Sequence, residues 1–183
     1  MKELSLNILD IAENSVKAGA TLTEILVEET GDTLTLTIRD DGCGMDEDTV
    51  RGVTDPFYTT RTTRPVGMGL PLLKLEAEQT GGTLTVTSRP QATHPTDHGT
   101  AVTATFRTDH IDCVPLGDVT ASVVTLIQGH PHTDFYLCHT RPGRDPVELD
   151  TRVLRQVLED VPLDTYEVLQ WIESSLREQY GPQ

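Results

Sequence analysis

The stretch Asp40-Asp41-Gly42-Cys43-Gly44-Met45 decides how this chain is interpreted, because it places a carboxylate and a glycine-rich turn after an expected strand, Thr33 to Arg39. Glycine lets the backbone approach a ligand closely and adopt positive φ. A carboxylate on such a turn would repel phosphate, but it can accept a hydrogen bond from an exocyclic amine. The turn therefore indicates a site for a base or another amine-bearing group, with phosphates held elsewhere. An ordinary surface turn is the alternative, since Asp-Gly pairs are common in turns.

Length, charge and cysteine content limit the class of protein. A chain of 183 residues suffices for one domain, or for one domain with an extension. No apolar run approaches the roughly 20 residues of a membrane span, and a helical pattern begins at once, which leaves no room for a signal peptide. The net charge is −15, so the surface should repel nucleic acid and anionic membranes. Three scattered cysteines suit a reducing compartment. These features predict a soluble, cytoplasmic protein that binds neither nucleic acid nor membrane.

The N-terminal segment predicts a helix from Lys2 to Ala18 that is apolar on most sides. A narrow polar stripe follows one face of this helix, because its members recur every three or four residues. They are Glu3, Asn7, Asp10, Asn14 and Lys17. A carboxylate, an amide and an ammonium one turn apart suit a magnesium ion and a phosphate chain, since magnesium takes few protein ligands, all oxygen. The alternative is the solvated stripe of an ordinary amphipathic helix.

Alternating apolar residues predict a hairpin formed by Thr21 to Glu28 and Thr33 to Arg39. A short helix is expected from Asp46 to about Val53, followed by a loop rich in hydroxyls and cations. The loop ends at Gly67-Met68-Gly69-Leu70, and a further helix is expected from there to about Thr80. Glycines before a helix N-terminus, with arginines in the preceding loop, make an anion site. Helix capping and tight packing are the alternative explanation of these glycines.

Two more alternating strands, Thr83 to Ser88 and Thr100 to Arg107, complete an ordered series of motifs. The series runs Asp10-x3-Asn14-x2-Lys17, Asp40-x-Gly42-x-Gly44, Asp55-Pro56-Phe57-Tyr58-Thr59-Thr60, Gly67-x-Gly69-Leu70, Gly81-Gly82 and Gly99-Thr100. In this order the motifs resemble the GHKL superfamily of histidine kinase-like ATPase domains, over about residues 1 to 108. The resemblance implies an α/β fold of the Bergerat type. That fold is an α+β two-layer sandwich in which helices cover one face of a mixed, mostly antiparallel sheet.

The resemblance also implies roles for individual residues. Asn14 would bind magnesium, Lys17 would contact the phosphates of ATP, and Asp40 would accept a hydrogen bond from the adenine amino group. Asp10 is the candidate catalytic residue, because it stands where hydrolysing members carry a general-base Glu, but its side chain is one methylene shorter. Further candidates for nucleotide contacts lie in the turn, in the lid loop and on the last strand. They are Gly42, Gly44, Met45, Phe57, Arg61, Arg64, Gly67, Met68, Gly69, Leu70 and Thr100.

Two departures from the family pattern matter. Pro65 replaces the usual first glycine of the glycine box, and it should stiffen the exit of the lid. All six histidines follow the lid, and none lies in a phosphoacceptor helix of the histidine kinase type. The chain is therefore expected to be a stand-alone ATPase-domain protein and not a self-contained sensor kinase. The segment His94-Pro95-Thr96-Asp97-His98 could suggest a metal site, but a polar loop is the favoured interpretation.

Residues 109 to 183 lie outside the resemblance and are predicted to form a separate extension of unknown role. A helix is expected from Gly117 to Gln128 and a strand from Thr133 to His139. Two more helices should follow, one capped by Asp150 and one opened by a capping box at Asp164-Thr165-Tyr166-Glu167. This helix-rich extension either packs on the ATPase core or docks a partner.

Three functions are open at this point. The leading hypothesis is a Mg-ATP-dependent enzyme that hydrolyses ATP or phosphorylates a separate protein. The second is a nucleotide-gated regulatory module, similar to anti-sigma proteins, in which ATP closes the lid and alters the grip on a partner. A degenerate scaffold is disfavoured because the binding motifs are present. The partner would be a phosphoacceptor protein or another bound protein, and a second copy of the chain in a homodimer could complete the site.

Overall fold

The predicted central hairpin is present in the computed structural model, which describes residues 2–55, 57 and 68–182. Strands β1 (Leu22–Thr30) and β2 (Thr33–Asp40) pair in antiparallel register, from Thr30 opposite Thr33 to Thr23 opposite Asp40. Every second side chain along the middle of each strand is buried. That burial follows the alternation in the sequence, because successive side chains of a strand point to opposite faces.

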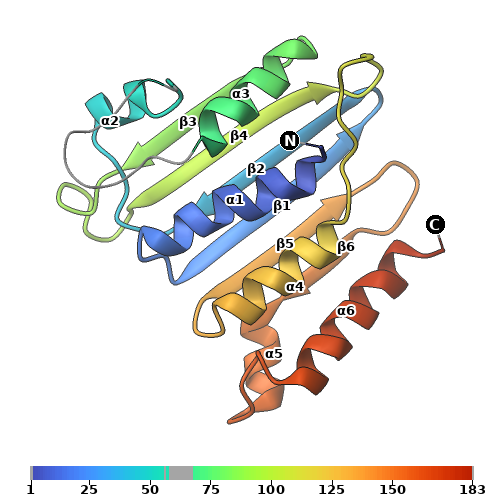
Figure 1. The fold of residues 1–183 in the computed structure, drawn as a ribbon. Coiled ribbons are helices and arrows are strands. Elements are labelled where there is room, and N and C mark those ends of the chain that lie inside the picture. The colour runs from blue at the N-terminus through green and yellow to red at the C-terminus, as the bar shows by residue number, and fades with distance from the viewer. Residues whose placement is uncertain (1, 56, 58–67, 183) are drawn as a thin grey trace.

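Four more strands extend this hairpin on both sides. Strands β3 (Leu84–Arg89) and β4 (Gly99–Arg107) lie beyond β2, while β5 (Asp134–Thr140) and β6 (Val147–Asp150) lie beyond β1. The order across the sheet is β3-β4-β2-β1-β5-β6 (Figure 1). Among the described strands, β1 and β5 are the one parallel pair. The sheet is therefore mixed and mostly antiparallel, which confirms the predicted fold class.

Helices cover one face of this sheet (Figure 1). They are α1 (Leu4–Lys17), α3 (Gly69–Gln79), α4 (Val119–Gly129) and α6 (Tyr166–Tyr180). The core lies between the two layers and includes Ile8 of α1, Leu36 of β2 and Phe106 of β4, all fully buried. The short helix α2 (Glu47–Gly52) follows the turn after β2, and α5 (Thr151–Leu158) follows β6. Within the described parts of the chain, every helix is too short or too polar to traverse a bilayer.

The segment after residue 108 differs from its prediction in two details. It contains β6, which was not predicted, because a strand of four residues with two apolar side chains carries little pattern. The N-cap of α6 is Thr165, and its side chain makes no capping hydrogen bond to the helix. The predicted capping box at Asp164 is therefore wrong. The Thr165 hydroxyl instead donates to the Pro162 carbonyl at 2.7 Å.

The strands of this C-terminal segment continue the sheet of the N-terminal segment. Strand β5 pairs with β1 from Leu22 opposite Asp134 to Glu28 opposite Thr140. Helix α4 packs on α1, and the buried Ser122 hydroxyl donates to the Ser5 carbonyl at 2.8 Å. The extension thus packs on the core, which is one of the two alternatives that the sequence left open. The division into two domains at residue 108 stays a prediction.

A buried histidine joins three elements at the end of the sheet that lies away from Asp40. His139 of β5 places Nε2 2.7 Å from Glu29 Oε1 of β1 and Nδ1 3.0 Å from the hydroxyl of Tyr180 on α6. Burial lowers the pKa of His139, although the hydrogen bond to Glu29 opposes this effect. Burial also raises the pKa of Tyr180 to about 12. The fold therefore favours neutral imidazole.

The lowered pKa of His139 predicts that acidification destabilises the fold. A histidine in the unfolded chain has a pKa of about 6.5. Between the lower pKa of the folded state and that value, the unfolded chain binds more protons, so the free energy of unfolding decreases as the pH falls. We expect this decrease in urea unfolding of the wild type below about pH 6.5, and we expect His139→Gln to lose this component. A wild-type-minus-variant difference that stays constant through this range would contradict the prediction.

Candidate functional site

The turn after β2 holds the Asp40 carboxylate from two sides. Asp40 Oδ1 accepts from the Gly42 N–H at 2.9 Å, and Oδ2 accepts from the Ser15 hydroxyl of α1 at 2.7 Å. The side chain is half-buried, and each carboxylate oxygen can accept a further hydrogen bond. Asp40 is therefore a pre-oriented acceptor that a ligand amine could reach.

Two glycines of this turn are needed because the backbone packs closely on its neighbours. A Cβ on Gly42 would lie 2.9 Å from both Ala18 Cβ and Asp40 Oδ1. Gly44 has a φ of +68°, and a Cβ there would overlap the Arg89 carbonyl oxygen. Because these glycines have no side chain, the turn can pack closely against the end of α1 and the end of β3.

The strand beside β2 brings further predicted residues to the turn. Thr100 of β4 pairs with Asp40 across the sheet. Its hydroxyl lies 2.8 Å from the Ser88 hydroxyl, which accepts from the Met45 N–H at 2.7 Å. The structure therefore gathers Asp40, Gly42, Gly44, Met45 and Thr100 around one turn, and their contact with a base stays a prediction. Ser15 and Ser88 were not predicted, and no sequence signal marks them.

The polar stripe of α1 divides into an open part and a buried part. Asp10 and Lys17 are exposed, and Asn14 is half-buried. Asn7, expected in the same stripe, is fully buried, and its Nδ2 donates to Glu76 Oε2 of α3 at 2.7 Å. The interpretation of this stripe as one accessible face is thus wrong at Asn7. That residue connects α1 to the helix after the lid.

Asp10 lies against the N-terminus of α3. A Cβ on Gly69, the first residue of α3, would overlap Asp10 Oδ2. The absence of a side chain at Gly69 therefore lets α3 approach the carboxylate. The N-terminus of a helix carries partial positive charge, so this is also where a phosphate would be stabilised. Asp10 and the predicted phosphate-binding end of α3 are thus neighbours.

The oxygen ligands on α1 fit a magnesium ion that is held mainly by phosphate and water. Asn14 and Asp10 lie four residues apart, and side chains at this spacing share one helix face. Magnesium retains several waters and takes few protein ligands. Within the described residues, no group of three or more His, Cys, Asp or Glu side chains could hold a metal by itself.

The lid is only partly described. Arg61, Arg64 and Gly67 lie outside the described residues, so their predicted contacts with phosphate stay predictions. Phe57 is 89% exposed, and its N–H donates to Asp55 Oδ1 at 2.9 Å. The two other candidates lie at the start of α3, where Met68 is exposed and Leu70 is buried in the core. Their predicted contacts with a nucleotide also stay predictions.

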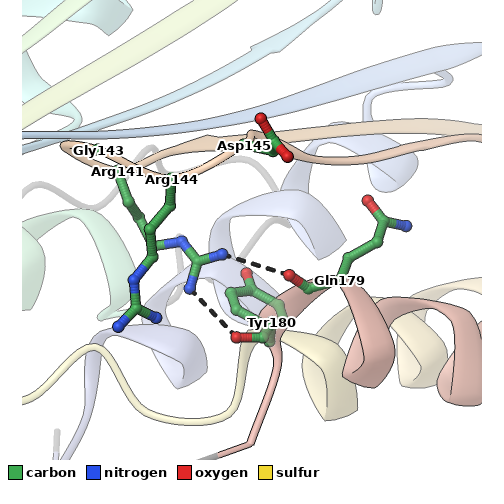
Figure 2. Close-up of a pocket in the computed structure, with 6 residues that line it drawn as sticks. All are labelled: Arg141, Gly143, Arg144, Asp145, Gln179 and Tyr180. Atoms are coloured by element: carbon green, nitrogen blue, oxygen red, sulfur yellow. Dashed lines mark hydrogen bonds between the residues drawn. The ribbon is translucent and has the colours of Figure 1, made fainter.

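A hollow of about 510 Å³ lies at the end of the sheet away from Asp40. Figure 2 shows the residues that line it. Arg141 lines this hollow, and its guanidinium donates to the carbonyls of Tyr180 and Gln179 at 3.5 and 3.4 Å. The same group stacks 5.0 Å from the centre of the Tyr180 ring. Arginine at the C-terminus of a helix satisfies its last carbonyls. Arg141 therefore caps the C-terminus of α6.

A family comparison identifies the protein family of the segment that contains the Asp40 turn. The model of the family described as "Histidine kinase-, DNA gyrase B-, and HSP90-like ATPase" matches residues 2–110. The chain belongs to this family. The match confirms the resemblance to the GHKL superfamily that the motifs indicated. Membership in this ATPase family also supports binding of ATP by the chain.

One curated protein that is similar to this chain is the sensor histidine kinase YvrG of Bacillus subtilis (strain 168). It is 33% identical over 100 residues, which correspond to 51% of this chain and 16% of that protein. The chain therefore spans less than a fifth of the length of this relative.

Two solved structures share the ATPase fold of this chain. The N-terminal domain of a DNA repair protein matches with a TM-score of 0.58 at 17% identity, over 82% of this chain and 53% of that one. The MutL ATPase domain of Aquifex aeolicus, complexed with ADP, matches with a TM-score of 0.55 at 13% identity, over 75% of this chain and 60% of that one. At these identities the likeness shows the fold alone. A match over 82% of the chain also includes part of the segment after residue 108.

Proposed function

We propose that this protein is a Mg-ATP-dependent enzyme of the GHKL type that hydrolyses ATP or transfers its γ-phosphate to a separate protein. The observation that carries the proposal is the Asp40 carboxylate, which is fixed by Gly42 and Ser15 yet remains partly accessible in a chain of an ATPase family. A carboxylate in this state can accept a charge-assisted hydrogen bond from the amino group of adenine.

The residues of α1 would serve the phosphates. Asn14 would bind magnesium, which when bound neutralises phosphate charge and orients the chain of phosphates. Lys17, three residues further along the helix, would add positive charge. Asp10 would accept a proton from water or from an acceptor hydroxyl, because its exposed carboxylate lies beside the end of α3 where the phosphate is expected.

The partner is also part of this proposal. The resemblance to a sensor histidine kinase over 51% of the chain favours a phosphoacceptor protein, supplied in the cytoplasm as a separate chain. A second copy of the chain is the alternative partner if the enzyme works as a homodimer.

The shorter side chain of Asp10 favours a second candidate function. A carboxylate that cannot reach the attacking water would leave ATP bound and intact. The protein would then be a nucleotide-gated regulatory module that changes its grip on a partner when ATP binds, with little or no turnover.

The fate of γ-labelled ATP with magnesium separates these functions. We expect the wild type to release phosphate, and Asp10→Asn to release it about 100-fold more slowly, because a positioned base contributes on the order of 10² to 10⁴ in rate. ATP binding is measured on the same samples by calorimetry. Bound but intact ATP would favour the regulatory module or a kinase that lacks its acceptor. Failure to bind ATP at all would overturn the proposal.

A further inference from the structure

We propose that His98 is a positioning residue for the base-binding turn, an inference that rests on the proposed function of that turn in binding ATP. Its ring donates a hydrogen bond to the carbonyl of Gly42 and thereby holds the residue whose N–H orients Asp40. The sequence suggested only a polar loop for this histidine, and the family match assigns it no role.

The contact defines which ring nitrogen of His98 carries a hydrogen. His98 Nδ1 lies 2.6 Å from the Gly42 carbonyl oxygen, and the side chain is partly buried. A carbonyl oxygen can only accept, so Nδ1 must carry the hydrogen. Neutral imidazole satisfies this requirement in its Nδ1–H tautomer, which differs from the Nε2–H tautomer in a way that spectroscopy can detect.

Gly42 transmits the contact to Asp40. The N–H of Gly42 donates to Asp40 Oδ1 at 2.9 Å, while its carbonyl accepts from His98. The next residue is also fixed, because the Cys43 N–H donates to the Ala18 carbonyl at 2.9 Å. A rotation of the turn that releases the His98 contact would therefore also disturb the carboxylate that is proposed to recognise adenine.

The rest of the β3–β4 connection and the end of β3 support the same turn. The Gln91 N–H donates to the Cys43 carbonyl at 2.9 Å, and Ser88 accepts from the Met45 N–H. Among the described residues between β3 and β4, His98 supplies the side-chain hydrogen bond to the turn, whereas Gln91 uses its backbone. Removing the His98 donor should loosen the turn without removing its backbone anchor.

His94 offers a matched control in the same loop. Its Nδ1 lies 2.9 Å from the Thr93 hydroxyl, and the side chain is exposed. A substitution of His94 therefore changes the loop composition in the same way and leaves the turn contacts in place.

Three variants test the role of the donor. His98→Asn keeps an N–H donor near the position of Nδ1, His98→Leu has a similar shape without a donor, and His94→Leu is the control. We expect His98→Leu to weaken ATP binding about fivefold, as the loss of one hydrogen bond predicts. His98→Asn and His94→Leu should stay within about twofold of the wild type. Nitrogen NMR of the ligand-free wild type should show His98 protonated on Nδ1.

Two results would overturn the inference: equal ATP affinity for His98→Leu and His98→Asn, or an Nε2–H tautomer of His98. If His98→Leu fails to fold, the tautomer of His98 in the wild type and the ATP affinity of His98→Asn still test the inference. If the wild type does not bind ATP, the proposed function fails by itself. Amide hydrogen exchange at Gly42 and Cys43 without nucleotide then tests the positioning role, with about fivefold faster exchange expected in His98→Leu than in His98→Asn. Equal exchange in those two variants would refute it.

Discussion

Asp40→Asn is expected to weaken ATP binding by about 100-fold, because the site would lose the charged acceptor for the adenine amino group. The side-chain amide keeps one oxygen, and the Gly42 N–H or the Ser15 hydroxyl can occupy it. The amide NH₂ would then face the amino group of the base, so two donors would meet. Calorimetric titration with ATP measures the effect.

Asp41→Asn is the matched control, since it removes the same charge from the next residue. The Asp41 carboxylate faces β1, where it accepts from the Thr21 and Leu22 N–H groups at 2.7 and 2.9 Å. This variant should lose stability and keep its affinity for ATP. Equal losses of affinity in Asp40→Asn and Asp41→Asn would show that charge alone matters, and the adenine assignment would be wrong.

Base specificity gives an independent measure of the same contact. GTP carries a carbonyl where ATP carries the amino group, so the wild-type carboxylate should reject it. Asp40→Asn presents an NH₂ donor and should reduce the ratio of ATP affinity to GTP affinity. An unchanged ratio would mean that Asp40 does not contact this edge of the base.

The fold was predictable where a local pattern decides the structure. The alternation of β1, β2 and β4 and the mostly apolar pattern of α1 specify these elements and their buried faces. The parallel pairing of β1 with β5 was not predictable, since 103 residues separate Thr30 of β1 from Asp134 of β5 and no local signal names the partner. Strand β6 was missed because its pairing with β5, and not its own composition, makes it a strand.

The candidate site was predictable to the extent that motifs mark it. Asp40, Gly42 and Gly44 stand in the expected turn, and the sheet register places Thr100 opposite Asp40. The residues that support this turn were missed. Ser15, Ser88 and His98 acquire their roles from contacts with residues distant in the sequence, and a Ser or His in isolation is more often an ordinary surface or packing residue.

Phe135→Ala is expected to destabilise the whole chain by about 3 to 5 kcal/mol, the usual cost of removing a buried phenylalanine side chain. Phe135 is fully buried on β5, where it lies opposite Thr23 of β1. It belongs to the same hydrophobic cluster as Ile25 and Phe106. Because one core and one sheet join the segments before and after residue 108, the substitution should lower the midpoint of one unfolding transition that both segments share.

Phe106→Ala is the matched control in the N-terminal segment, because Phe106 of β4 is equally buried. Unfolding is followed with two probes: the fluorescence of Trp171, the single tryptophan, on α6, and the far-ultraviolet circular dichroism of the whole chain. If the segments form one cooperative unit, both probes shift together in both variants. Two separate domains at residue 108 would behave differently: Phe135→Ala would move the Trp171 transition and leave a second, unshifted transition in the dichroism. A single shared transition would mean that β5 and β6 are structural parts of the ATP-binding sheet, so that a chain cut at residue 108 would expose the buried edge of β1.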